Sequence, residues 1–236
     1  MKLIGITGKS GAGKTTLSNL IGQNENVGVI HIDELMEKVK KQKLSGMMDN
    51  NKEGEPVAIK KNIRKILYGN KYIFLAYIKA KGILLNPKIN EKIKQLEEEG
   101  KEVVVIECIY LKYFPIFKQL DKKVLVQRPY IKRQESVLER DKEKNMDKEV
   151  FAIWDLPHKR SYYKDDIGSY EYKINNNNDK DYLKQVAKEI YEDVKEISIQ
   201  DKRKQNFKPY KCKTKKLEID RNSPKIREEE KTNETR

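Results

Sequence analysis

The feature that most constrains this chain lies near its N-terminus, where residues 8–15 read Gly-Lys-Ser-Gly-Ala-Gly-Lys-Thr. This segment matches the pattern G-x-x-x-x-G-K-[ST] at every fixed position. Its glycines allow successive backbone N–H groups to turn inward around phosphate oxygens. A short apolar run, Leu3 to Thr7, precedes the segment, and residues with helical character, Thr15 to Ile21, follow it. We therefore expect a strand, a phosphate-binding loop and a helix whose positive N-terminus faces the anion.

The loop predicts both cofactors of this chain, ATP and Mg²⁺. Lys14 would place a compact positive charge on the β and γ phosphates, and the Thr15 hydroxyl would coordinate Mg²⁺. The expected nucleotide-binding residues are Gly8, Lys9, Ser10, Gly11, Ala12, Gly13, Lys14, Thr15 and Thr16.

Strand and helix patterns alternate through the first 197 residues, which we predict to form one domain. Val103 to Ile106 is a continuous apolar run, typical of a parallel strand that is covered on both faces. The other strand candidates are Leu3–Thr7, Val27–Ile32, Lys123–Gln127 and Glu171–Ile174. This alternation predicts an α/β fold, a three-layer α/β/α domain with a mostly parallel five-stranded sheet.

Between the second and third predicted strands, residues 56–99 are expected to form a helical acceptor-binding region. Glycines at 69 and 82 suggest breaks between two or three helices. Asn86 and Pro87 then resemble the start of a new helix, because Asn caps helices well and Pro suits the first helical position. Gly100 is expected to end that helix.

The second half of the chain contains a predicted lid and a predicted tail. A helix from Ile131 to Arg140 leads into the charged segment 141–166, which we expect to fold over the nucleotide. An amphipathic helix from Asp181 to Ile197 closes the domain, with Asn178 or Asp179 as its cap. Residues 198–236 lack a sustained apolar period, so we expect a basic, flexible tail.

The composition is strongly basic, with 51 Lys+Arg against 37 Asp+Glu and a formal net charge of +14. Such a balance suits nucleic-acid binding. However, Lys far outnumbers Arg and Asn is frequent, so we attribute the charge to a bias of the whole sequence. The two cysteines, Cys108 and Cys212, lack the spacing of a metal site, and no run approaches the roughly 18 apolar residues of a membrane span. These features predict a cytoplasmic protein with no membrane partner, and they leave the oligomeric state open.

Charged residues at the ends of predicted strands are candidates for chemistry, because ligands of parallel sheets bind outside the carboxyl ends of the strands. Asp33 follows the second strand and could accept the proton of an attacking hydroxyl, or could cap a helix. Glu107 follows the third strand and could hold Mg²⁺ through water, orient the acceptor or form a structural salt bridge. His31 shares a strand face with Asp33 and is expected to pack or hydrogen-bond.

Cations in the predicted lid could stabilise charge on the phosphoryl group that is transferred. Arg140 ends the helix that enters the lid, and we predict that it closes over the triphosphate. Arg160 is a second candidate for this role. Trp154 is expected to pack in the core, with a hinge or acceptor-pocket role as the alternative.

The sequence resembles the P-loop kinases of small molecules and, among them, most resembles the dephospho-CoA kinases over most of residues 1–195. The phosphate loop is the most specific point of resemblance. The other matching segments are His-Ile-Asp-Glu-Leu-Met at 31–36, Leu-Asn-Pro at 85–87, the stretch from Pro129 to Arg140-Asp141, and Pro-His-Lys-Arg at 157–160.

The chain departs from that family on the acceptor side. His31 replaces the first acid of an Asp-x-Asp motif, and Ser136 replaces an arginine of the lid helix. Glu37 stands where an arginine is usual, Asn86 replaces a histidine, and residues 109–113 differ from the family's sequence after the third strand.

The resemblance implies a kinase that transfers the γ-phosphoryl group of ATP to the 3′-hydroxyl of dephospho-CoA. Lys14, Asp33 and Arg140 are then the expected catalytic residues, and Thr15 and Glu107 the expected Mg²⁺ ligands. Two alternatives remain open. The acceptor could be another small molecule, such as uridine, another nucleoside or a nucleotide, or the domain could be a nucleotide-gated switch whose basic tail contacts nucleic acid.

Overall fold

The computed structural model describes residues 1–45, 65–144, 146–159, 169–177 and 180–204. Within these ranges, five strands form one sheet in the order β2-β3-β1-β4-β5, and every neighbouring pair is parallel. The strands are β1 (Lys2–Gly8), β2 (Val27–His31), β3 (Val103–Glu107), β4 (Lys122–Gln127) and β5 (Tyr172–Asn175). The predicted α/β fold and its five strands are confirmed, and the sheet is wholly parallel.

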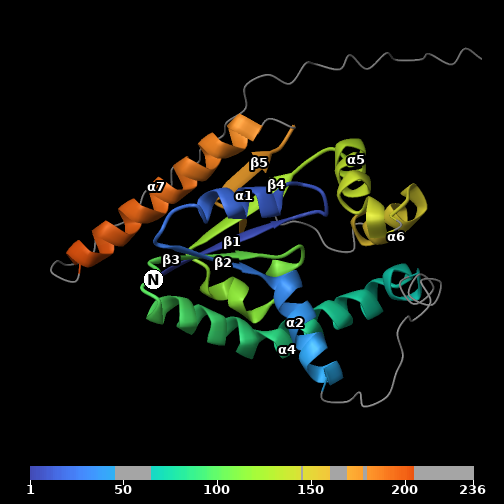
Figure 1. Ribbon diagram of the computed structural model, residues 1–236, viewed down its shortest axis with the longest axis horizontal. Coiled ribbons are helices and arrows are strands. Elements are labelled where there is room, and N and C mark those ends of the chain that lie inside the picture. Colours follow the sequence, from blue (N-terminus) through green and yellow to red (C-terminus); the bar gives the residue numbers. More distant parts are fainter. Residues whose placement is uncertain (46–64, 145, 160–168, 178–179, 205–236) are drawn as a thin grey trace, which may run out of the picture.

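Helices cover both faces of the sheet, as Figure 1 shows. On one face lie α1 (Lys14–Ile21) and α7 (Lys180–Lys204), and on the other lie α2 (Ile32–Ser45) and α4 (Lys71–Glu98). The short 3-10 helices η1 (Leu111–Tyr113) and η2 (Pro115–Gln119) join the second layer. Beside the carboxyl ends of the strands lie α5 (Tyr130–Arg140), η3 (Lys142–Lys144) and α6 (Lys148–Lys159).

Strand periodicity divides the apolar residues between two cores. Successive side chains of a strand point to opposite faces, so Ile4 and Ile6 of β1 pack with α1 and α7, whereas Leu3 packs toward the second layer. In β3, all five residues from Val103 to Glu107 are buried. A strand that is covered on both faces can be apolar throughout, and this explains why its sequence shows no alternation.

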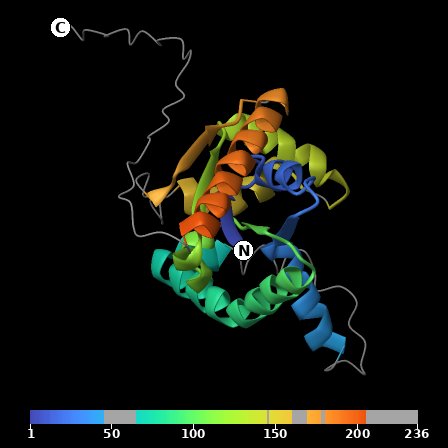
Figure 2. The ribbon, with the colours of Figure 1, turned by 90° about the vertical axis from the view of Figure 1, so that its left-hand side faces the viewer.

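The region between β2 and β3 differs from the prediction. A single helix, α4, runs for 28 residues through Gly82 and contains Pro87 in its interior, so the predicted break at Gly82 and the predicted start at Asn86 are wrong. Its cap is Asn70, whose side chain accepts from the N–H groups of Tyr72 and Ile73. Figure 2 shows α4 as one bowed helix beneath the sheet, and a bend is the expected response to an internal proline.

Packing explains why Gly82 does not interrupt the helix. A Cβ atom added at Gly82 would lie 2.9 Å from a ring carbon of Phe114 and 3.1 Å from its Cα atom. The glycine therefore lets the segment between η1 and η2 approach the helix backbone closely. Residues 65–69 are also helical, so the predicted break near Gly69 agrees with the structure.

Other boundaries shift by a few residues. Helix α2 begins at Ile32, which places Asp33 in its first turn, and α7 continues past the predicted end at Ile197 to Lys204. Within the predicted lid, α6 buries Phe151, Asp155 and His158, whereas Trp154 is only half-buried. Residues 56–64, 160–168, 178–179 and 205–236 lie outside the described residues, and with them Arg160, the predicted cap and most of the predicted tail.

Among the helices of the described ranges, none is long and apolar enough to cross a membrane.

We predict that Gly82→Ala destabilises the fold although alanine favours helices. Alanine gains about 1 kcal/mol in helix propensity, but its methyl group would overpack against Phe114, which typically costs about 1–3 kcal/mol. Gly69→Ala is the matched control, because a Cβ atom there meets nothing within 4 Å. Urea unfolding measures both variants. Equal or greater stability of Gly82→Ala relative to the wild type would contradict the close approach of Phe114.

Candidate active site

The phosphate loop connects β1 to α1 and is closed by a hydrogen bond from the Ala12 N–H to the Lys9 carbonyl at 3.1 Å. Gly11 and Gly13 adopt positive φ angles of 75° and 101°, a conformation that glycine tolerates best. Space also excludes side chains at both positions. A Cβ atom would lie 2.5 Å from the Arg133 carbonyl oxygen at Gly11 and 2.4 Å from the Asn176 Nδ2 atom at Gly13.

The structure brings Glu107 to the start of α1. The Lys14 Nζ atom lies 3.5 Å from Glu107 Oε1, and the Thr15 hydroxyl donates to Glu107 Oε2 at 3.3 Å. Both side chains of the ion pair are only 7% exposed. The sheet explains this meeting, because β3 pairs with β1 in a register that places Glu107 opposite Ile6, two residues before the loop begins. The salt bridge that was one expectation for Glu107 is therefore present, and it forms with the lysine of the phosphate loop.

His31 connects Glu107 to α1. Its Nδ1 atom lies 3.2 Å from Glu107 Oε2, and its Nε2 atom lies 3.1 Å from Asn19 Oδ1. The hydrogen bond with Glu107 raises the pKa of His31 despite partial burial. Burial opposes ionisation of Glu107, but the bond from His31 and the charge of Lys14 outweigh it and lower the pKa of this carboxyl. Glu107 therefore stays ionised at neutral pH.

The residues at this point fit a magnesium ion. Mg²⁺ prefers hard oxygen ligands and is usually held by one or two protein groups together with phosphates and water. The Thr15 hydroxyl and the Glu107 carboxylate supply such oxygens side by side. Over the part of the chain that the structure describes, no cluster of three or more His, Cys, Asp or Glu residues forms a separate metal cage.

Asp33 lies two residues beyond His31, in the first turn of α2, and its side chain is exposed. Its charge reaches the end of β3, since burial and then the negative charge of Asp33 raise the pKa of the Cys108 thiol to about 12. Because His31 at the end of β2 pairs with Glu107 and α2 begins at the next residue, Asp33 lies at the same edge of the sheet as Glu107. Its role as general base stays a prediction.

Arg140 ends α5 and is 58% exposed. Its Nε atom donates to the buried carboxylate of Asp141 at 3.1 Å, and a second bond to the same oxygen comes from a terminal guanidinium nitrogen. Closure of this side chain over a triphosphate stays a prediction.

His158 at the end of α6 is a buried member of the site. Its ring stacks on Tyr110, with ring centroids 5.9 Å apart. Burial and the charges of Lys9, Arg133 and Lys14 lower its pKa to about 3. His158 is therefore neutral at physiological pH.

Sequence reasoning missed three side chains that contact the outside of the loop. They are Arg128, Arg133 and Asn176, and each donates to a carbonyl of the loop. Arg128 also donates to the Ser136 hydroxyl at 2.8 Å, where the resembling family has an arginine in its lid helix. The sequence held one signal for the two arginines. Only nine of the 51 basic residues are Arg, so an arginine stands out in this chain.

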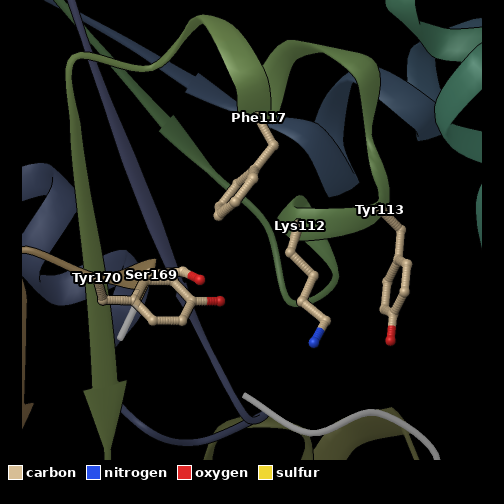
Figure 3. A pocket seen from close by; sticks show the side chains of 5 residues that line it. All are labelled: Lys112, Tyr113, Phe117, Ser169 and Tyr170. Carbon is tan, nitrogen blue, oxygen red and sulfur yellow. The ribbon is translucent and has the colours of Figure 1, made fainter. Parts of the chain in front are cut away.

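A small cavity of about 180 Å³ lies elsewhere, between η1, η2 and the residues before β5. Figure 3 shows the side chains that line it, Lys112, Tyr113, Phe117, Ser169 and Tyr170. None of these lining residues belongs to the phosphate loop, and none is His31 or Glu107 at the strand ends. The candidate active site is therefore defined by charge and backbone geometry rather than by this hollow.

These observations define a phosphate-binding α/β domain of the P-loop class. The sequence matches the family described as AAA domain over residues 4–156, and the chain belongs to this family. The loop follows β1, the central strand of the five-stranded parallel sheet, which is the arrangement of a P-loop α/β fold.

Solved structures are similar to this chain at low sequence identity. Protein TT1252 from Thermus thermophilus is 18% identical, with a TM-score of 0.55 over 82% of this chain and 97% of that chain. A dephospho-CoA kinase from Campylobacter jejuni is 18% identical, with a TM-score of 0.43 over the same shares. A shikimate kinase from Acinetobacter baumannii is 15% identical, with a TM-score of 0.46 over 82% of this chain and 93% of that chain.

The pKa values of the two histidines should lie on opposite sides of the ordinary value of 6.5, above it for His31 and below it for His158. The His31 resonance in an NMR pH titration is expected to change above pH 6.5, whereas His158 should stay neutral down to about pH 4. By linkage, the stability from His158 is present above pH 6.5 and is lost as the pH falls, by at most about 1.4 kcal/mol per pH unit.

Between pH 6.5 and 4.5, the free energy of unfolding should therefore fall less for His158→Phe than for the wild type. For His31→Gln it should fall as much as for the wild type. His31 contributes stability that is present below pH 6.5 and lost as the pH rises through its raised pKa. A His158 resonance that titrates near 6.5 would contradict its burial beside the loop cations.

Proposed function

We propose that the protein is an ATP-dependent kinase that transfers the γ-phosphoryl group to a hydroxyl of a small acceptor, with dephospho-CoA as the leading candidate. The observation that carries this proposal is the meeting of Lys14, Thr15 and Glu107 at the mouth of the phosphate loop. Lys14 supplies a cation for phosphates, and Thr15 and Glu107 supply two oxygen ligands for a divalent ion.

The loop residues would bind and orient the nucleotide. The backbone N–H groups of the loop and the N-terminus of α1 would hold the β phosphate, and Lys14 would contact the β and γ phosphates. Thr15 and Glu107 would hold Mg²⁺, which neutralises charge on the β and γ oxygens when it is bound. His31 would keep the Glu107 carboxylate ionised and oriented through its bond at 3.2 Å.

The acceptor would approach from the side of α2. Its hydroxyl oxygen forms the new bond to the γ phosphorus, the bond from that phosphorus to the β–γ bridging oxygen breaks, and ADP leaves. The hydroxyl proton passes to the Asp33 carboxylate, which is exposed in the first turn of α2. Arg140 would close over the transferring group from the end of α5.

The case for dephospho-CoA depends on the sequence resemblance at residues 31–36, 85–87 and 157–160. The chain departs from that family at His31, Asn86 and Ser136, so the acceptor is tested separately from the kinase activity. Asn86 lies inside α4, where its side-chain oxygen is buried and has no hydrogen-bond partner among the described residues.

An acceptor panel with Mg-ATP tests the substrate directly. Purified protein is incubated with dephospho-CoA, uridine, other nucleosides, nucleotides and shikimate, and each product is quantified by mass. We expect dephospho-CoA to give CoA at the highest rate. Lys14→Ala should lose nearly all turnover while the protein stays folded, because His31 still binds the Glu107 carboxylate. Turnover of another acceptor without CoA formation would reject the substrate while keeping the kinase.

Asp33→Asn should lower kcat by at least about 100-fold, within the range of general-base removal, with little change in the affinity for Mg-ATP. The reason is that the amide cannot accept the hydroxyl proton. Glu34→Gln is the matched control, because it removes an equal charge from the next exposed position of the same turn. Wild-type kcat in both variants would show that Asp33 does not accept the hydroxyl proton.

A further inference from the structure

The outer side of the phosphate loop is held by side chains through three consecutive carbonyls. The Ser10 carbonyl accepts from Arg133 at 3.2 Å, the Gly11 carbonyl from Arg128 at 3.0 Å, and the Ala12 carbonyl from Asn176 at 2.8 Å. The donors are 117 to 164 residues away from their acceptors along the chain. No local property of the loop sequence therefore accounts for this arrangement.

Each donor is itself fixed by a second contact. The Arg133 guanidinium is 2% exposed and binds both oxygens of Asp155 in α6, at 2.7 and 3.1 Å. Arg128 binds the Ser136 hydroxyl of α5. Asn176 is buried, and its own N–H donates to the Gln127 carbonyl at the end of β4 at 2.8 Å. The donors are therefore preorganised rather than freely rotating.

Peptide geometry links these contacts on the outside of the loop to the direction of the N–H groups on its inside. In a planar trans peptide, the carbonyl of one residue and the N–H of the next point in opposite directions. Outward carbonyls at Ser10 and Ala12 therefore turn the N–H groups of Gly11 and Gly13 toward the inside of the loop. The carbonyl of Gly11 likewise orients the Ala12 N–H, which closes the turn onto Lys9.

We propose that Arg128, Arg133 and Asn176 form an outer clamp that positions the loop N–H groups for nucleotide phosphates. None of the three needs to touch the nucleotide, so they are positioning residues. The Arg133 guanidinium also connects α6 to the loop, because it binds Asp155 of α6 and the Ser10 carbonyl at the same time. The inference depends on the nucleotide-binding half of the proposed function and not on the identity of the acceptor.

The first test removes one donor without changing charge. Asn176→Leu leaves the buried Ala12 carbonyl without its partner, and we expect the affinity for Mg-ATP, measured by titration calorimetry, to fall about tenfold. Asn90→Leu is the matched control, because Asn90 is exposed on α4 far from the loop in sequence. An affinity of Asn176→Leu within twofold of the control would overturn the clamp.

The second test separates positioning from simple stability. Arg133→Met alone leaves Asp155 as a buried unpaired charge and should destabilise the fold, whereas Arg133→Met with Asp155→Leu replaces the pair by apolar groups and should restore Tm. The clamp predicts that the double variant regains Tm but still binds Mg-ATP about tenfold more weakly, because the Ser10 carbonyl has lost its donor. Wild-type affinity in the double variant would show that Arg133 is only structural and would overturn its place in the clamp.

Arg128 gives an independent measurement if the Arg133 variants fail to fold. Arg128→Met should weaken Mg-ATP binding, and Arg128→Lys should restore part of it by returning a donor for Gly11. Lys94→Met, an equal loss of charge at a position that is 76% exposed, is the control. Equal affinities of Arg128→Met and Lys94→Met would argue against the clamp. These measurements need no acceptor, so an inactive acceptor panel would leave their outcome interpretable.

Discussion

The buried ion pair between Lys14 and Glu107 is the interaction on which the candidate site depends. Two charges that are each 93% removed from solvent are costly unless they compensate one another. Lys14 needs a partner before any phosphate arrives, and Glu107 provides one that also holds the Thr15 hydroxyl. The lysine and the start of α1 are therefore in position in advance, and in the proposed function an incoming phosphate would meet an ordered site.

The sheet order makes this ion pair possible. Because β3 lies between β2 and β1, its last residue can contact groups on both neighbours. Glu107 stands opposite His31 of β2 in one ladder and opposite Ile6 of β1 in the other. One carboxylate thus connects the loop to the strand that leads into Asp33. Parallel strands bring these ends together although 76 residues separate His31 from Glu107.

The sequence predicted those parts of the structure whose signals are local. Glycine spacing defined the loop, and apolar runs located the five strands, because each of these patterns reports a conformation of its own segment. The continuous helix α4 was missed since Gly82 and Pro87 are local breaking signals, and contacts with a distant residue, Phe114, outweigh the first of them. Tertiary packing routinely overrides such propensities.

The pairing of Thr15 with Glu107 could be anticipated from strand ends, but the contacts on the outside of the loop could not. Arg128, Arg133 and Asn176 have no fixed spacing from the residues they bind, and only the folded sheet brings them together. The ion pair of Asp155 could not be predicted from the sequence either, because its partner Arg133 lies on another helix. A lone acidic residue in a charged segment also resembles a solvated one.

The use of two kinds of cation around the loop follows from their geometry. In the proposed function, Lys14 would neutralise phosphate charge as a compact point charge, and lysine does this well. Arg133 binds the Ser10 carbonyl and both oxygens of Asp155 at once, which requires the planar fork of a guanidinium. Arg128 donates from one terminal nitrogen to the Gly11 carbonyl and the Ser136 hydroxyl. In a chain with 42 lysines, arginine at position 133 is therefore explained by the need for several directed donors rather than by the need for charge.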